Sequence, residues 1–305
     1  MTGGAGFIGS HVVDRLLAHG HEPCIFDLVA SPYHPAAEVE AVIGDLTDEE
    51  TAFAAARGCD AIAHLAAVAD VNVVVADPRR ADLVNVRGTQ TMLEAARDAG
   101  AARFLYASTV WVYGNGPANA TVTEDTPIAL PSHLYTATKL AGEMYCRSYE
   151  TLYGIACTIL RFGIPYGPRA RGAAVVPSFV ARAQAGQPFT IAGDGSQTRQ
   201  FVYVEDLADG IVAALAPVAA GRTYNLVGEE STSVRQIADT VRELVADVPV
   251  VHEAERPADV RFGHISGARA TDDLGWQPET SFADGVRRYV EWLAVTNGSP
   301  VAPAA

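Results

Sequence analysis

Short apolar segments alternate with amphipathic segments along the first half of the chain. Strands are predicted at residues 22–26, 42–43, 61–65 and 103–107. A helical spacing of apolar positions covers residues 89–99, between the last two of these strands. This alternation is typical of a parallel, doubly wound α/β sheet, in which ligands bind beyond the carboxyl ends of the strands. Asp45, Ala66 and Thr109 each follow a predicted strand, so we expect them to line one crevice.

A glycine-rich loop precedes the first helical pattern, which covers residues 11–17. Gly3, Gly6 and Gly9 form a G-x-x-G-x-x-G sequence, close to the G-x-G-x-x-G fingerprint of dinucleotide sites. Such a loop lets the backbone approach a pyrophosphate at a helix N-terminus. Asp27 ends the next strand, where an acid suits the ribose hydroxyls of NAD and repels the extra phosphate of NADP. The order of loop, helix, strand and acid therefore predicts NAD as the cofactor.

A single lysine, Lys139, occurs in the chain, four residues after Tyr135. Side chains at positions i and i+4 share one face of a helix. A nearby ammonium can lower the pKa of a phenol from its ordinary value of about 10. A tyrosine tuned in this way is a general acid or base for hydroxyl and carbonyl groups. We therefore expect Tyr135 and Lys139 to be catalytic, with an ordinary surface pair on a helix as the alternative interpretation.

Composition and charge narrow the class of protein. The net charge of −14 and the absence of a basic stripe exclude nucleic acid as a partner, but not a nucleotide ligand. No apolar run approaches the roughly 18–20 residues that span a bilayer, and the N-terminus has no basic segment of a signal peptide. We therefore expect no membrane partner and a cytoplasmic location. Four cysteines and eight histidines show no metal-ligand spacing, so we expect no metal.

Nine motifs along the chain occur in a family-specific order. They lie at residues 2–9, 44–46, 64–67, 85–89, 135–139, 166–168, 193–199, 201–206 and 256–259. With them, nearly the whole chain resembles the extended short-chain dehydrogenase/reductase family. The resemblance is to its NAD-dependent nucleotide-sugar epimerases and dehydratases, in particular those like UDP-glucose 4-epimerase. The resemblance implies a Rossmann-like doubly wound parallel sheet with a smaller C-terminal substrate lobe.

The resemblance also implies roles for individual residues. Tyr135 exchanges a proton with a sugar hydroxyl, Lys139 holds the nicotinamide ribose, and Thr109 hydrogen-bonds the reacting oxygen and so also contacts substrate. Besides Tyr135 and Lys139, the implied cofactor-binding residues are Gly3, Gly6, Phe7, Ile8, Gly9, Asp27, Asp45, Leu46, Leu65, Ala66 and Ala67. Arg199 and Arg256 match arginines that grip the substrate diphosphate, a task suited to a bidentate guanidinium.

Other positions set limits on these roles. In family dehydratases, Asp and Glu typically follow the position of Thr109, and decarboxylases usually have Glu at the second place. Here these positions are Val110 and Trp111, which cannot take a proton from carbon, so epimerisation or plain oxidoreduction is favoured over elimination. Trp111 is a candidate apolar wall against the sugar, with a role in the core equally open. Ile164 replaces an Asn that commonly meets substrate, and Asn85 is expected to brace the nucleotide loop.

The domain organisation follows from the resemblance and from the less regular second half. Helices are predicted at residues 172–182 and 237–245, and strands at 189–191 and 224–226. We expect an NAD-binding Rossmann domain at 1–165 with segments near 200–225 returning to it, a mainly substrate-binding lobe at 166–296, and a disordered tail at 297–305. Because only Met1 stands before Thr2, we also expect the first strand to be truncated and the natural protein to begin upstream.

These observations predict NAD-dependent epimerisation of a nucleotide-diphosphate sugar at C4 through a 4-keto intermediate. Dehydration, decarboxylation and 4-keto-sugar reduction are alternatives on the same fold. A third possibility is a non-catalytic NAD-binding protein, against which the Tyr135–Lys139 pair argues. The expected partners are a nucleotide-sugar substrate and, from the resemblance alone, a second copy of the chain in a homodimer.

Overall fold

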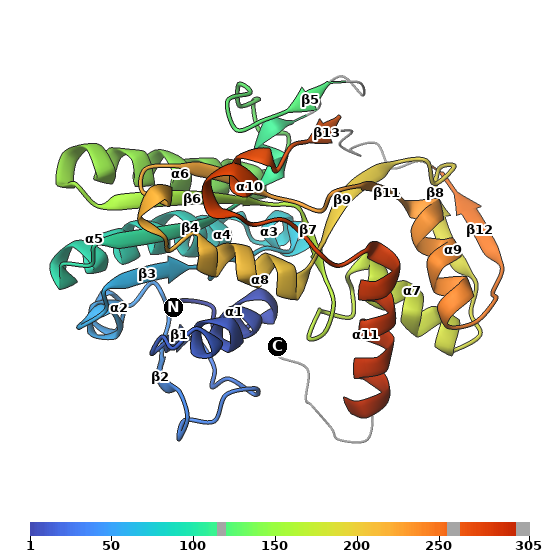
Figure 1. Cartoon of the computed structure of the whole chain (residues 1–305), viewed down its shortest axis with the longest axis horizontal. Coiled ribbons are helices and arrows are strands. Elements are labelled where there is room, and N and C mark those ends of the chain that lie inside the picture. Colours follow the sequence, from blue (N-terminus) through green and yellow to red (C-terminus); the bar gives the residue numbers. More distant parts are fainter. Residues whose placement is uncertain (115–119, 255–262, 297–305) are drawn as a thin grey trace.

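The protein is described by a computed structural model that covers residues 1–114, 120–254 and 263–296 (Figure 1). A parallel sheet lies at its centre, built from β1 (Cys24–Asp27), β2 (Glu40–Ile43), β3 (Ala61–His64), β4 (Arg103–Thr109), β6 (Ala156–Phe162) and β10 (Thr223–Leu226). β1 pairs with β2, while the other four strands lie in the order β10–β6–β4–β3. Thr2 joins the two parts through parallel bridges to Phe26 of β1 and His64 of β3. The strand order reverses on either side of Thr2, which confirms the expected doubly wound α/β sheet.

Residues 1–3 lie between β1 and β3. The amide of Thr2 donates to the carbonyl oxygen of Ala63 at 3.0 Å, and the amide of Gly3 donates to that of Phe26 at 3.0 Å. The amide of Phe26 donates in turn to the carbonyl oxygen of Met1 at 2.7 Å. The glycine loop therefore leaves this position at the carboxyl edge of the sheet.

Helices cover both faces of the sheet. One face carries α1 (Phe7–Ala18), α8 (Val204–Ala213) and α10 (Ala268–Leu274), and the other α2 (Glu49–Ala56), α5 (Gly88–Ala99) and α6 (Leu134–Tyr153). Strand β4 shows why the two layers form, because successive side chains of a strand point to opposite faces. Leu105 and Ala107 belong to the core with α1 and α8, whereas Phe104 and Tyr106 belong to the core with α5 and α6. A strand buried on both faces is mainly apolar along its middle, as β4 is from Phe104 to Ala107.

Shorter elements line the edge of the sheet where the site lies. They are α3 (Val71–Ala76), α4 (Pro78–Asp82), the π-helical turn η1 (Leu83–Arg87), the 3₁₀ turn η2 (Val110–Tyr113), and the paired strands β5 (Thr121–Val122) and β13 (His264–Ile265). The 3₁₀ turn η3 (Pro217–Ala219) lies at the opposite edge, where Thr158 near the start of β6 donates to the carbonyl oxygen of Ala219 at 2.7 Å. In the described part of the chain, no helix is both long and apolar enough to cross a membrane.

A second group of elements has a core of its own (Figure 1). It contains β7 (Ile164–Tyr166), α7 (Val175–Gln184), β8 (Phe189–Ala192), β9 (Thr198–Tyr203), β11 (Ser231–Ser233), α9 (Val234–Leu244), β12 (Val250–Glu253) and α11 (Phe282–Thr296). Phe179 and Phe189 stack at its centre with ring centroids 4.7 Å apart. β9 leads directly into α8, so the chain returns to the main sheet after residue 203. The predicted tail at 297–305 lies outside the described residues.

Candidate active site

The glycine loop packs tightly against the end of β3. Gly3 has a φ of 74°, and a Cβ there would lie 2.8 Å from the amide nitrogen of Ala66. A Cβ on Gly9 would lie 2.0 Å from the carbonyl oxygen of Gly3. Gly6 is the N-cap of α1, and the first turn of the helix contains no acid. No side chain caps the N–H groups of this turn, which fits the pyrophosphate of a dinucleotide.

Asp27 closes the same loop from the end of β1. Its Oδ2 accepts a hydrogen bond from the amide of Ala5 at 2.9 Å, and its Oδ1 accepts one from the amide of Leu28 at 2.7 Å. A carboxylate has about four acceptor sites, so two bonds leave capacity for ribose hydroxyls. The position and chemistry of Asp27 therefore fit the adenosine end of NAD.

Asp45 and Leu46 follow β2 along the same edge. Asp45 pairs with the guanidinium of Arg80 at 2.6 Å and accepts two hydrogen bonds from Thr47. Burial raises the pKa of Asp45, but these hydrogen bonds and the charge of Arg80 outweigh it and hold the pKa below its usual value. Leu46 is buried, and a Cβ on Gly88 would lie 3.1 Å from its Cβ. Arg80 was missed by the sequence analysis, because nothing in its local pattern distinguishes it from a surface cation.

Asn85 braces the loop that contains Leu65, Ala66 and Ala67, as expected. Its side chain donates to the carbonyl oxygen of Val68 at 3.0 Å and accepts from the amide of Val68 at 2.7 Å. It also donates to the hydroxyl of Thr138 on α6 at 3.0 Å. The π-helical turn η1 turns Asn85 inward, and such turns are frequent at functional sites. The loop is thereby tied to the helix that carries Lys139.

A hydrogen-bonded chain through His64 supports the loop from below. Thr89 donates to the carbonyl oxygen of Asn85 at 2.6 Å, so its oxygen accepts from His64 Nε2 at 3.0 Å. His64 Nδ1 is then an acceptor for the Thr2 hydroxyl at 2.8 Å, and the Thr2 oxygen accepts from the amide of Ala66 at 3.2 Å. Burial lowers the pKa of His64 to about 3, and the charge of Lys139 acts in the same direction. The imidazole is therefore neutral at physiological pH.

Tyr135 and Lys139 lie in the first turns of α6, beside the end of β4. The ammonium of Lys139 is buried and donates to the carbonyl oxygen of Ala107 at 2.9 Å. Thr109 ends β4 and is buried, and its hydroxyl oxygen accepts from the amide of Trp111 at 3.2 Å. The structure thus brings Tyr135, Lys139 and Thr109 to one sheet edge.

The expected effect of Lys139 on Tyr135 is wrong. Burial raises the pKa of the Tyr135 phenol to about 12, and the cation that acts against this is Arg171. Burial also lowers the pKa of Lys139 to about 8, partly offset by Cys146 and Glu143. For both groups the loss of hydration is the largest effect on the pKa, and the Lys139 ammonium donates to a backbone carbonyl of β4.

Trp111 forms an aromatic wall next to the tyrosine. Its ring meets Tyr135 edge to face at 6.1 Å and lies 5.0 Å from the ring of His133. It is partly buried against the cluster of Val110 and Val112, so the core interpretation of Trp111 applies in part, and its contact with a sugar stays a prediction. His133, the N-cap of α6, was missed by the sequence analysis.

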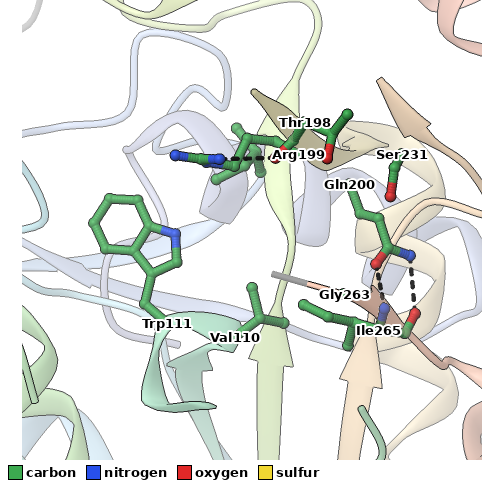
Figure 2. Close-up of a pocket in the computed structure, with 9 residues that line it drawn as sticks. Val110, Trp111, Thr198, Arg199, Gln200, Ser231, Gly263 and Ile265 are labelled. Atoms are coloured by element: carbon green, nitrogen blue, oxygen red, sulfur yellow. Dashed lines mark hydrogen bonds between the residues drawn. The ribbon is translucent and has the colours of Figure 1, made fainter. Parts of the chain in front are cut away.

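A pocket extends from this wall towards the second group of elements. It is lined by Val110, Trp111, Ile164, Thr198, Arg199, Gln200, Ser231, Gly263 and Ile265 (Figure 2). The Arg199 guanidinium donates to the carbonyl oxygen of Thr198 at 2.7 Å and reaches the side of the pocket where the Trp111 indole lies. Gln200 fixes the opposite side through hydrogen bonds of 2.6 and 2.8 Å with the backbone of Ile265. Arg256 lies outside the described residues.

A buried ion pair forms at α6, one turn beyond Lys139. Glu143, one turn after Lys139, binds Arg161 through Nε at 3.0 Å and Nη2 at 2.7 Å. It also accepts from the hydroxyl of Ser108 at 2.5 Å, next to Thr109. Arg161 donates further to the hydroxyl of Tyr113 at 2.9 Å. The sequence gives one indication of this pair. Positions 135, 139 and 143 are four residues apart, so Glu143 lies on the same helix face as Tyr135 and Lys139.

The arrangement defines an NAD-dependent enzyme, because the cofactor cradle and the tyrosine–lysine pair lie at the same edge of the sheet. Residues 1–227 match the model of the NAD dependent epimerase/dehydratase family. The chain belongs to this family, whose enzymes use NAD and act on nucleotide sugars. Its homologues include both epimerases and dehydratases.

Several relatives match almost end to end. The chain is 38% identical to UDP-glucose 4-epimerase of Mycolicibacterium smegmatis, over 96% of this chain and 97% of that protein. It is 31% identical to dTDP-glucose 4,6-dehydratase of Shigella flexneri, over 97% and 93%. The crystal structure of UDP-glucose 4-epimerase of Thermotoga maritima with UDP-glucose has a TM-score of 0.91 at 30% identity, covering 97% of this chain and 98% of that one. That of Thermus thermophilus with NAD has a TM-score of 0.89 at 34% identity, covering 96% and 97%.

Proposed function

We propose that this protein is a nucleotide-sugar 4-epimerase that works through a 4-keto intermediate. The observation that carries the proposal is the wall of Val110 and Trp111 beside Tyr135. Elimination of water needs a group that takes a proton from carbon, and neither side chain can do so. The similarity to UDP-glucose 4-epimerases supports the same reaction and UDP-glucose or UDP-galactose as the first substrates to test.

In this proposal Tyr135 moves the proton. When bound, NAD would supply the redox chemistry, as the acceptor of hydride from the sugar carbon and, once reduced, as its donor. Tyr135 takes the proton of the sugar hydroxyl and gives it back when the alcohol re-forms, so no proton is consumed overall. Thr109 holds the reacting oxygen through its hydroxyl. Arg171 favours the phenolate against the effect of burial.

Other residues bind and orient. One N–H of the Lys139 ammonium donates to the carbonyl oxygen of Ala107, and the other two are available for the nicotinamide ribose. The pyrophosphate is bound by the glycine loop and the start of α1, at Gly3, Gly6, Phe7, Ile8 and Gly9. Asp27 binds the adenosine ribose. The remaining sides of the cofactor are contacted by Asp45, Leu46, Leu65, Ala66 and Ala67. Arg199 and Arg256 grip the substrate diphosphate. We also propose, from the family resemblance, a cytoplasmic homodimer.

The test is incubation of the purified protein with UDP-galactose and separation of the products. We expect UDP-glucose of unchanged mass and no net reduction of added NAD. A product lighter by one water would replace this proposal with a 4,6-dehydratase. Tyr135→Phe should lower turnover by about 10²–10⁴-fold while NAD still binds, because it removes the proton-transfer group and little else. Wild-type turnover in this variant would contradict the role of Tyr135.

A further inference from the structure

The loop between β7 and α7 contains a residue in an unusual backbone conformation. Arg169 has a φ of 65°. Within the described ranges, it is the only residue other than glycine with a positive φ. Side chains rarely adopt this conformation, and it persists where the surroundings enforce it. The contacts of the Arg169 side chain therefore call for a functional explanation.

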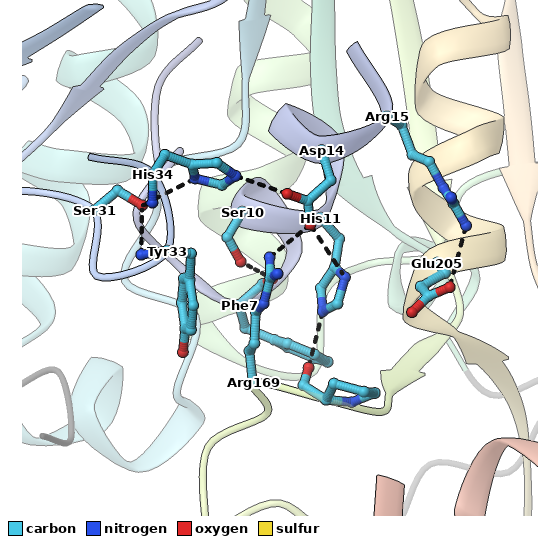
Figure 3. A network of polar contacts seen from close by, with 11 residues as sticks. Phe7, Ser10, His11, Asp14, Arg15, Ser31, Tyr33, His34, Arg169 and Glu205 are labelled. Atoms are coloured by element: carbon cyan, nitrogen blue, oxygen red, sulfur yellow. Dashed lines mark hydrogen bonds and ion pairs between the residues drawn. The ribbon is translucent and has the colours of Figure 1, made fainter. Parts of the chain in front are cut away.

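The loop is fastened to the helix that follows the glycine loop (Figure 3). Arg169 pairs with Asp14 of α1 at 2.8 Å, and the side chain of Arg169 is 18% exposed. The carbonyl oxygen of the preceding Pro168 lies 3.0 Å from Nε2 of His11, which therefore donates to it. Both contacts fall within the first eight residues of α1, whose N-terminus follows the glycine loop.

The same contacts reach the segment that follows Asp27. The guanidinium of Arg169 lies over the ring of Tyr33, 4.3 Å from its centroid. Asp14 also binds Nε2 of His34 at 2.8 Å, and Nδ1 of His34 lies 3.0 Å from the hydroxyl of Ser31. Figure 3 shows Tyr33 and His34 converging with Arg169 on this part of α1. Residues 31–34 are thus held in place from two sides, through Asp14 and through Arg169.

We propose that Arg169 is a positioning residue for the cofactor. By binding Asp14 and covering Tyr33, it fixes residues 31–34, which closely follow Asp27, and so keeps the adenosine end of NAD in its site. An enzyme that oxidises and then reduces the same sugar must retain its cofactor throughout the cycle. The proposal rests on NAD binding at the glycine loop and Asp27, but not on which sugar is the substrate.

The experiment measures NAD binding without any sugar. Arg169→Ala should raise the Kd for NAD and the rate of NAD release by about tenfold, which corresponds to about 1.4 kcal/mol. Titration calorimetry and dilution into excess competing nucleotide give the two quantities. Arg15→Ala is the matched control, since Arg15 also pairs α1 with carboxylates, at 3.2 Å from Glu205 and 2.9 Å from Asp209, but does not touch residues 28–34. It should change the Kd by less than about twofold.

A second variant separates positioning from folding. Arg169→Gly removes the side chain but suits the positive φ, so it should stay folded and still weaken NAD binding by about tenfold. At saturating NAD, turnover of both variants should return to within about twofold of wild type. An unchanged Kd and release rate in both variants would overturn the proposal and leave Arg169 a structural residue. Wild-type protein that binds no NAD would overturn the cofactor assignment together with this proposal.

Discussion

Two ion pairs of nearly equal length hold opposite ends of the site. Glu143–Arg161 lies next to the helix face of Tyr135 and Lys139 at 2.7 Å, with side chains 2% and 5% exposed. Asp14–Arg169 lies beside residues 31–34, which follow Asp27, at 2.8 Å, with side chains 40% and 18% exposed. Breaking a buried pair leaves an uncompensated charge in a dry environment, whereas water solvates the survivor of an exposed pair. Burial, and not distance, therefore decides which end of the site tolerates change.

The largest effect is expected at the buried pair. Glu143→Ala should lower the free energy of unfolding by about 3–5 kcal/mol, because the guanidinium of Arg161 remains buried without a carboxylate. Urea denaturation measures the loss. As a control, Glu143→Met combined with Arg161→Met should recover most of it, since neither charge then remains. A loss below about 1 kcal/mol in the single variant would remove the difference between the two regions.

An intermediate effect is expected at His11, next to the exposed pair. Burial lowers the pKa of His11 to about 4 from 6.5, and Arg169 and Arg15 act in the same direction. The unfolded state therefore binds more protons between pH 6.5 and 4, and stability falls as the pH falls through this window.

The test of this acid sensitivity is a comparison with His11→Gln, which keeps a donor for Pro168. Between pH 7 and 5, the wild type should lose about 2 kcal/mol more than the variant. Denaturation at several pH values measures the difference. Equal losses in the two proteins would mean that His11 is not kept neutral in the fold.

The smallest effect is expected from Asp14→Asn. The carboxylate is substantially exposed, so its removal should cost about 1 kcal/mol of unfolding free energy or less. The cost should shrink further in high salt, which screens exposed charges. Denaturation at low and high ionic strength checks both statements. A cost as large as that of Glu143→Ala would show that the two pairs are energetically alike.

The parts of the site predicted from sequence are local. The glycine loop, Asp27 and the spacing of Tyr135 and Lys139 each depend on a few neighbouring residues, and predicted strands at 61–65 and 103–107 match β3 and β4 within two residues. The partners that were missed are distant along the chain. Arg80 is 35 residues from Asp45, and Arg169 is 155 residues from Asp14. Such pairs arise only when the elements pack.

The direction of the Tyr135 pKa was missed for a related physical reason. The spacing of Tyr135 and Lys139 shows that a cation is near, but it does not show how much water the fold removes. Burial raises the pKa of the phenol, and the cation that opposes it, Arg171, comes from a different loop. Charge patterns can be read from a sequence, whereas desolvation depends on the folded protein.

The hydroxyl of Thr2 limits how this chain can evolve. It donates to His64 and accepts from Ala66, so one small side chain completes both the centre of the sheet and the cofactor loop. Serine could make the same two bonds, but valine, which has the same shape, could make neither. Because His64 stays neutral at physiological pH, no change in acidity inside a cell would relax this requirement. Among natural variants of this chain, position 2 should therefore drift between threonine and serine while the sugar pocket diversifies.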